Sequence, residues 1–276
     1  MIPFSDTPKV NSNPPVVTLA IIIVVLLVFL MQIFFSRLGI ISGTDNLGSI
    51  SFLNKWGFIP RELSTGRSYM SLFELMGLES SLCLDVVGKA RDNCFIYVEN
   101  VNTQLRLINI ESAVPTSITL VTSMFLHGGA THFLGNVVFL WVFGDNVEHR
   151  LGVIKYVLLY FTTGVVAGLT HYWIDPTSDT VLVGASGAIS GVMGAYLLLF
   201  PSNRVRVLFM VVLITVAEIR ALYVLGLWFL WQAVQALLQI GMSSTVQVAF
   251  MAHVGGFLAG MLFVCIFTNV LLQRRQ

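Results

Sequence analysis

The stretch VVTLAIIIVVLLVFLMQIFF, Val16–Phe35, holds 20 residues and no charged side chain. As a helix it would rise about 30 Å, which matches the hydrocarbon thickness of a bilayer. No small-residue cleavage site follows Phe35, so we expect a retained transmembrane helix rather than a cleaved signal peptide.

The whole chain has the composition of a membrane protein. It is 56% hydrophobic and 11% charged, with a mean hydropathy of +0.84, whereas soluble proteins carry about 25% charged residues. A net charge of +1, with no basic stripe, argues against a nucleic-acid partner. We predict an all-α membrane protein with a six-transmembrane-helix bundle. Its spans would be Val16–Phe35, Ser117–Phe143, Gly152–Trp173, Ala185–Phe200, Leu222–Ile240 and Val246–Leu271.

A shorter apolar run, Val205–Val216, lies between arginines on one side and Glu218 and Arg220 on the other. We expect it at the membrane interface or as a re-entrant approach to the fifth span.

Basic residues in short loops mark the cytoplasmic side. Arg150 and Lys155 lie where the second predicted span meets the third, and Arg204 lies between the fourth and the fifth. The intervening loop, on the opposite side of the membrane, holds Asp175 and Asp179. This bias predicts a multi-pass protein of the cell membrane with both termini in the cytoplasm.

The expected layout has five parts. They are a cytoplasmic tail (1–15), the first transmembrane helix (16–35), an external loop with short interfacial helices (36–116), a core of five helices (117–272) and a cytoplasmic tail (273–276). Cys83 and Cys94 fall in the external loop, where they either form a disulfide or remain free thiols.

Gly184-Ala185-Ser186-Gly187 places a lone serine at the start of the fourth span. The preceding residues contain Asp175 and Pro176 and are expected to form a loop, so the short helix would begin below the membrane surface. Free backbone N–H groups at a helix start can stabilise an oxyanion. Alternatively, Ser186 is a packing residue, since glycines follow it at helical spacing.

His253, in Ala252-His253-Val254-Gly255-Gly256, is the single ionisable residue of the sixth span. Gly256 and Gly260 lie on its face and would let this span approach the fourth, bringing His253 to Ser186. An ionisable group inside a membrane is costly and suggests function. A satisfied polar residue and a proton relay remain alternatives.

His132 and Asn136 are spaced i, i+4 and share one helix face. Both can donate hydrogen bonds to a developing oxyanion, although an interhelical polar clamp is the alternative. The chain has no His-Glu-x-x-His zinc motif and no pair of membrane aspartates. A Ser-His dyad without metal or cofactor is therefore the expected chemistry.

These residues make the chain resemble the rhomboid intramembrane serine proteases. The matching motifs are Gly184–Gly187, Ala252–Gly256 with Gly260, His132-x-x-x-Asn136, Phe125–Gly129 and Phe143–Gly152.

The resemblance implies a six-helix core with a Ser186–His253 dyad and an oxyanion hole from the Ser186 N–H, His132 and Asn136. It also implies that Glu148 and Arg150 tie helix ends to neighbouring loops. The substrates would be single-span transmembrane proteins, cut near the outer face of the lipid bilayer and commonly after a small residue. The oligomeric state stays open.

Some family members place an aromatic ring under the catalytic imidazole, at the position of Ser190 here. A serine cannot stack, so we expect a hydrogen bond or neighbouring packing to hold His253. Two other functions remain alternatives, a non-catalytic protein that binds membrane clients and a proton-coupled transporter that uses His253.

Overall fold

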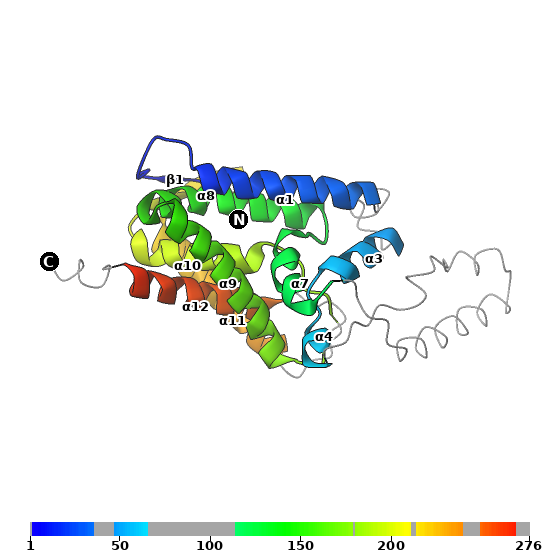
Figure 1. Ribbon diagram of the computed structural model, residues 1–276. Helices are drawn as coiled ribbons and strands as arrows, with labels where there is room; N and C mark the ends of the chain where they lie inside the picture. Colours follow the sequence, from blue (N-terminus) through cyan, green and yellow to red (C-terminus); the bar gives the residue numbers. More distant parts are fainter. Residues whose placement is uncertain are drawn as a thin grey trace, which may run out of the picture.

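The computed structural model describes residues 2–35, 47–65, 114–178, 180–210, 214–239 and 249–268. Long helices form a bundle in which α1 lies along α8, and α9, α10 and α12 pack against one another (Figure 1). These helices are α1 (Val16–Phe35), α8 (Ala130–Leu151), α9 (Val153–Ile174), α10 (Ser186–Leu199), α11 (Ala221–Gln239) and α12 (Phe250–Phe267). The thiols Cys83 and Cys94 and the tail 273–276 lie outside the described residues.

Among the described residues, four helices are long and apolar enough to cross a membrane, namely α1, α9, α11 and α12. The shorter α10 has 14 residues. The 22 residues of α8 include charged side chains in its last turns. The prediction of a mostly helical multi-pass membrane protein is confirmed.

The predicted second span, Ser117–Phe143, is not one helix. Helix α7 (Thr116–Thr122) and the 3-10 turn η2 (Ser123–Phe125) come first, and α8 begins only at Ala130. Between them, the side chain of Gln32 in α1 forms hydrogen bonds with both peptide groups of His127. Its Nε2 donates to the His127 carbonyl at 3.0 Å, and its Oε1 accepts from the His127 N–H at 3.0 Å. These peptide groups are therefore satisfied without a continuous helix.

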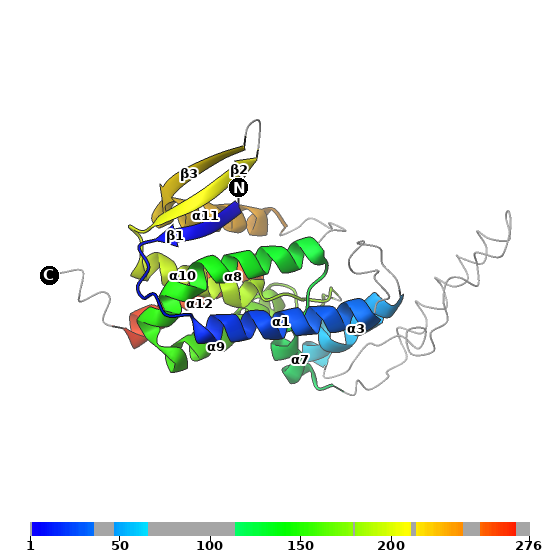
Figure 2. The same ribbon diagram turned by 90° about the horizontal axis from the view of Figure 1, so that it is seen from above.

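The all-α prediction is also wrong, because the structure contains an antiparallel sheet (Figure 2). Its strands, in the order β1-β2-β3, are β1 (Ile2–Thr7), β2 (Arg204–Met210) and β3 (Ile214–Arg220). The run expected at the interface or as a re-entrant segment forms the β2–β3 hairpin, and the expected N-terminal tail contributes β1. Exposed Arg204 and Arg206 alternate with buried Val205 and Val207, which is the period of a half-buried strand.

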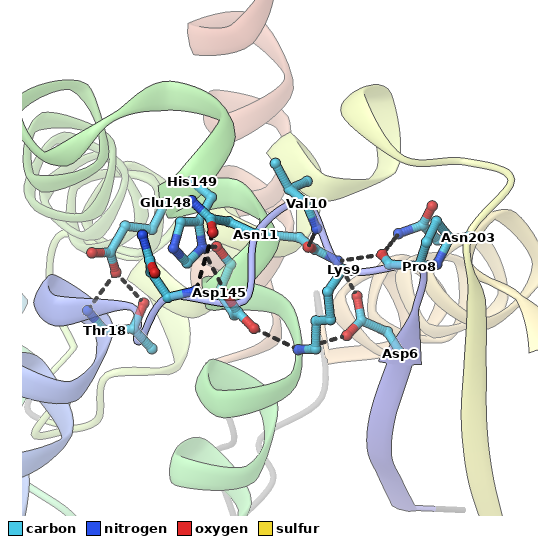
Figure 3. A network of polar contacts seen from close by, with 12 residues as sticks. Asp6, Pro8, Lys9, Val10, Asn11, Thr18, Asp145, Glu148, His149 and Asn203 are labelled. Atoms are coloured by element: carbon cyan, nitrogen blue, oxygen red, sulfur yellow. Dashed lines mark hydrogen bonds and ion pairs between the residues drawn. The ribbon is translucent and has the colours of Figure 1, made fainter.

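Polar contacts hold the N-terminal segment against the bundle (Figure 3). Asp6, which is 1% exposed, accepts hydrogen bonds from Asn146 of α8 and Tyr196 of α10. Lys9 lies 2.6 Å from Asp145 and 3.1 Å from Asp6. Burial lowers the pKa of Lys9, but the hydrogen bond to Asp145 and the charge of Asp6 outweigh it, so that the pKa is raised.

Glu148 ties the end of α8 to the start of α1 (Figure 3). Its buried carboxylate accepts from the N–H groups of Val17 and Thr18 and from the Thr18 hydroxyl, each at 2.8 Å. A carboxylate at a helix N-terminus satisfies free N–H donors and complements the helix dipole. Arg150, the other residue of the expected structural pair, is exposed in the last turn of α8.

Glycines set the distance between α10 and its two neighbours. A Cβ at Gly187 would lie 2.6 Å from the Cβ of Ala167 on α9, and a Cβ at Gly256 or Gly260 would overlap a backbone carbonyl of α10. Helices in membranes approach closely where such small residues meet. This contact fixes how far α12 stands from α10, as expected for Gly187, Gly256 and Gly260.

The segment that joins the short helices α3 (Leu47–Trp56) and α4 (Pro60–Thr65), together with α4, contacts the loop that leads into α10. Phe58 pairs with Leu182 in an antiparallel bridge, its N–H donating at 3.1 Å and its carbonyl accepting at 2.7 Å. The Arg61 N–H donates to the Ser178 carbonyl at 3.1 Å. These bonds fix the backbone just before Ser186.

Candidate active site

Ser186 and His253 lie within hydrogen-bond distance, although 67 residues separate them in sequence. The Ser186 Oγ is 2.8 Å from the His253 Nε2. Ser186 is the first residue of α10, and His253 lies in the first turn of α12. The glycine contact between the two helices is what permits this distance.

A third residue, Gln232 of α11, lies on the other side of the imidazole. Its Oε1 is 2.8 Å from the His253 Nδ1, and its side chain is 7% exposed. A carbonyl oxygen only accepts, so Nδ1 carries the proton and Nε2 is free to accept from the Ser186 hydroxyl. Sequence reasoning missed Gln232. The available signal was a polar amide in an apolar helix, a signal that Gln235 and Gln239 of the same helix share.

His253 is also packed as the sequence led us to expect. Ser190 cannot stack on the ring, and its hydroxyl instead donates to the Ser186 carbonyl at 2.6 Å. The hydrogen bond to Gln232 and the indole of Trp228, with ring centroids 6.1 Å apart, hold the imidazole. The sequence predicted a hydrogen bond or neighbouring packing in place of stacking, and the structure contains both.

His132 lies in the first turn of α8, beside the loop that precedes Ser186. Its Nδ1 accepts from the Gly128 N–H at 3.4 Å, so the proton sits on Nε2, which can donate. A Cβ added at Gly184 would be 2.8 Å from this Nε2 and 3.5 Å from the Ser186 Oγ. The His132 donor and the serine hydroxyl therefore both lie beside Gly184, and both residues line the same cavity.

Gly184 allows the imidazole of His132 to lie against the backbone before Ser186. The sequence had suggested a role in helix packing instead, which is corrected here. Its φ is +126°, a backbone conformation that favours glycine. A side chain at this position would also collide with the imidazole of His132.

Asn136 lies one turn after His132 on the same face of α8. It is 7% exposed, and its Nδ2 has no hydrogen-bond partner within the described part of the chain. Asn136 does not line the cavity that Ser186 and His132 share. A buried N–H donor without a partner lowers the stability of the folded state. The Asn136 Nδ2 is thus a donor that the described structure leaves unused.

Ser186 lines a cavity of about 280 Å³ whose wall is mainly apolar. The polar side chains at its wall are Ser123, Thr180, Ser186 and the imidazoles of His132, His171 and His253. His171 of α9 was not expected there. Its Nε2 is buried and has no partner among the described residues, and no group of His, Cys, Asp or Glu within those residues is arranged to hold a metal.

Comparison with known proteins identifies one family. The Rhomboid domain matches residues 115–270. The rhomboid-type protein YdcA of Bacillus subtilis is 40% identical over 78 residues, 28% of this chain and 39% of YdcA. RHOMBOID-like protein 5 of Arabidopsis thaliana is 29% identical over 141 residues, 51% of this chain and 41% of that protein.

The mitochondrial Rhomboid protein 1 of Saccharomyces cerevisiae is 27% identical over 173 residues, 59% of this chain and 45% of that protein. The chain thus spans about two fifths of the length of these relatives.

Proposed function

Because this chain belongs to the rhomboid family, we propose that it is an intramembrane serine endopeptidase that cleaves single-span transmembrane proteins. The observation that carries the proposal is the hydrogen-bonded series Ser186–His253–Gln232, in which Ser186 and His253 line an apolar cavity. The names of two Bacillus subtilis relatives, YdcA and GluP, describe rhomboid proteases, which supports the same activity here.

The reaction begins with proton transfer from the Ser186 hydroxyl to the His253 Nε2. The Ser186 Oγ then bonds to the peptide carbonyl carbon, whose oxygen becomes an oxyanion. When the C–N bond breaks, His253 gives its proton to the departing amine. A water molecule, deprotonated in turn by His253, hydrolyses the acyl-enzyme and restores the Ser186 hydroxyl.

Three groups are assigned to the oxyanion: the Ser186 N–H, the His132 Nε2–H and the Asn136 amide. As the first residue of α10, Ser186 has an N–H outside the helical hydrogen-bond series. The proton position on His132 and the unpaired Asn136 donor support the other two assignments. Donors fixed before the charge develops stabilise the transition state more than flexible ones do.

We assign six spans to the protein by adding α8 and α10 to the four long apolar helices. The cell membrane is the proposed location, with both termini cytoplasmic and residues 36–116 outside. The bonds of Phe58 and of Arg61 in α4 with the loop before Ser186 support a role of this segment in fixing the site. A substrate helix would have to unwind locally, because its peptide groups are otherwise hydrogen-bonded.

Labelling of detergent-solubilised protein by a fluorophosphonate, together with cleavage of single-span proteins mapped by mass spectrometry, tests the proposal. Wild type should label and cleave, and Ser186→Ala should do neither. Ser190→Ala, one turn along the same helix, is the matched control and should still label.

Label that persists in Ser186→Ala would remove Ser186 as the nucleophile. A wild type that retains single-span proteins without labelling or cutting them would favour the non-catalytic client-binding alternative. Proton-coupled flux that survives Ser186→Ala but not His253→Ala would favour the transporter.

A further inference from the structure

We propose that Gln232 is a positioning residue that fixes the tautomer of His253, in the place where a carboxylate would complete a catalytic triad. This inference rests on the proposed protease function. It goes beyond it by assigning a third helix, α11, to the reactive series.

The geometry gives each ring nitrogen one role. A neutral imidazole has one N–H, and the amide oxygen of Gln232 can only accept. The 2.8 Å contact at Nδ1 therefore places the proton there, which leaves the Nε2 lone pair for the Ser186 hydroxyl, also at 2.8 Å. Without Gln232, the tautomer with the proton on Nε2 becomes accessible, and that form cannot act as a base toward Ser186.

A neutral amide suits this place better than an acid. Gln232 is 7% exposed in a helix with no charged residue, where an ionised carboxylate would lose most of its hydration at a high cost. The amide oxygen still orients the ring, but it stabilises the imidazolium less than a carboxylate would. The chain thus keeps orientation without burying a charge.

The surroundings of His253 contain few other groups that could produce the same effect. Besides Gln232, its contacts among the described residues include Ser186 and the rings of Trp228 and Phe250. Two further histidines, His132 on α8 and His171 on α9, are near enough to interact with it electrostatically. These two are titratable, so any change of pH profile must be measured as a difference between variants that keep both.

The experiment compares wild type with Gln232→Leu and Gln232→Glu in detergent-solubilised full-length protein. Gln235→Leu is the matched control, since it removes an amide from the same helix at a half-buried position, whereas the buried amide of Gln232 is the one that bonds His253. The readouts are the rate of fluorophosphonate labelling, kcat and KM on one single-span substrate, and the pH profile of kcat. A thermal unfolding curve checks that each variant is folded.

Gln232→Leu should lower both labelling rate and kcat by about 10- to 100-fold with little change in KM, the usual size of effect when an orienting partner of a functional histidine is lost. Gln232→Glu should retain activity. The acid limb of its pH profile should move to higher pH by about one to three units, because a carboxylate beside Nδ1 stabilises the imidazolium. Gln235→Leu should match wild type in both respects.

Two results would overturn the inference while leaving the protease proposal intact. One is a folded Gln232→Leu that labels and cleaves like Gln235→Leu. The other is an active Gln232→Glu whose pH profile coincides with that of wild type. If wild type itself neither labels nor cleaves, the failure belongs to the proposed function instead.

Discussion

Replacing Asn136 with leucine should separate stability from activity. Its Nδ2 is buried without a partner in the described structure, and a buried unsatisfied donor costs the folded state about 1–3 kcal/mol. Leucine has a similar shape and no polar atom, so Asn136→Leu should leave the melting temperature unchanged or raise it. The alternative reading, an interhelical polar clamp, predicts a clear loss of stability.

Turnover should change in the opposite sense. Loss of one oxyanion donor costs about 2.7–4 kcal/mol of transition-state stabilisation, or about 10²–10³ in kcat. Substrate binding does not use the oxyanion, so KM should change little. The combined expectation is a protein that is at least as stable as wild type and at least a hundredfold slower.

The assay pairs thermal unfolding in one detergent with kcat and KM on one single-span substrate. Asn136→Ala is the companion variant. It removes the same donor, so kcat should fall equally, but it leaves a cavity that lowers stability. A destabilised Asn136→Leu with unchanged kcat would refute the reasoning and establish Asn136 as a clamp.

Three further predictions concern the scaffold. Gly256→Ala should cost about 1–3 kcal/mol by overpacking and should slow fluorophosphonate labelling, because its Cβ overlaps the Gly187 carbonyl. Gly226→Ala, at a position open to space, is the control, and equal labelling by both would contradict the contact. Glu148→Gln should lose roughly 2 kcal/mol of stability, since an amide N–H would face the α1 donors that the carboxylate accepts from. Glu218→Gln, in a surface ion pair 41% exposed, should lose less than about 1 kcal/mol, and a larger loss than that of Glu148→Gln would disprove the capping role. Lys9 has a folded pKa raised above its ordinary 10.5, so its stabilising effect is complete below pH 10.5 and is lost as the pH rises through the folded value. The melting-temperature difference between wild type and Lys9→Met should therefore be constant from neutral pH up to pH 10.5 and shrink at higher pH, and a difference that does not shrink there would contradict this role of Lys9.

The parts of the structure that the sequence could predict are those with local physical signals. A serine and a histidine stand out in apolar segments that disfavour them, and glycines at helical spacing indicate which faces of α10 and α12 meet. Their hydrogen bond, at 2.8 Å, follows from these two signals together. The bounds of α1 were predictable for the same reason, since the apolar run ends where the helix ends.

The parts that escaped prediction depend on residues far apart in the chain. The helix break before α8 requires Gln32 to bond the peptide groups of His127, 95 residues away. β1 has no stable form until β2 is present beside it. Gln232 was not singled out because α11 also holds Gln235 and Gln239, and only the rotation of α11 against α12 decides which amide meets the imidazole.

The pairing of β1 with β2 has a consequence for biosynthesis. Asp6 meets Tyr196 across 190 residues of chain, so the opening strand has no partner when it leaves the ribosome. At about 5–20 residues per second, it waits roughly 10–40 seconds for its neighbours to be translated. Strand β1 is thus among the last elements to pack, and its docking completes the polar contacts with α8 and α10.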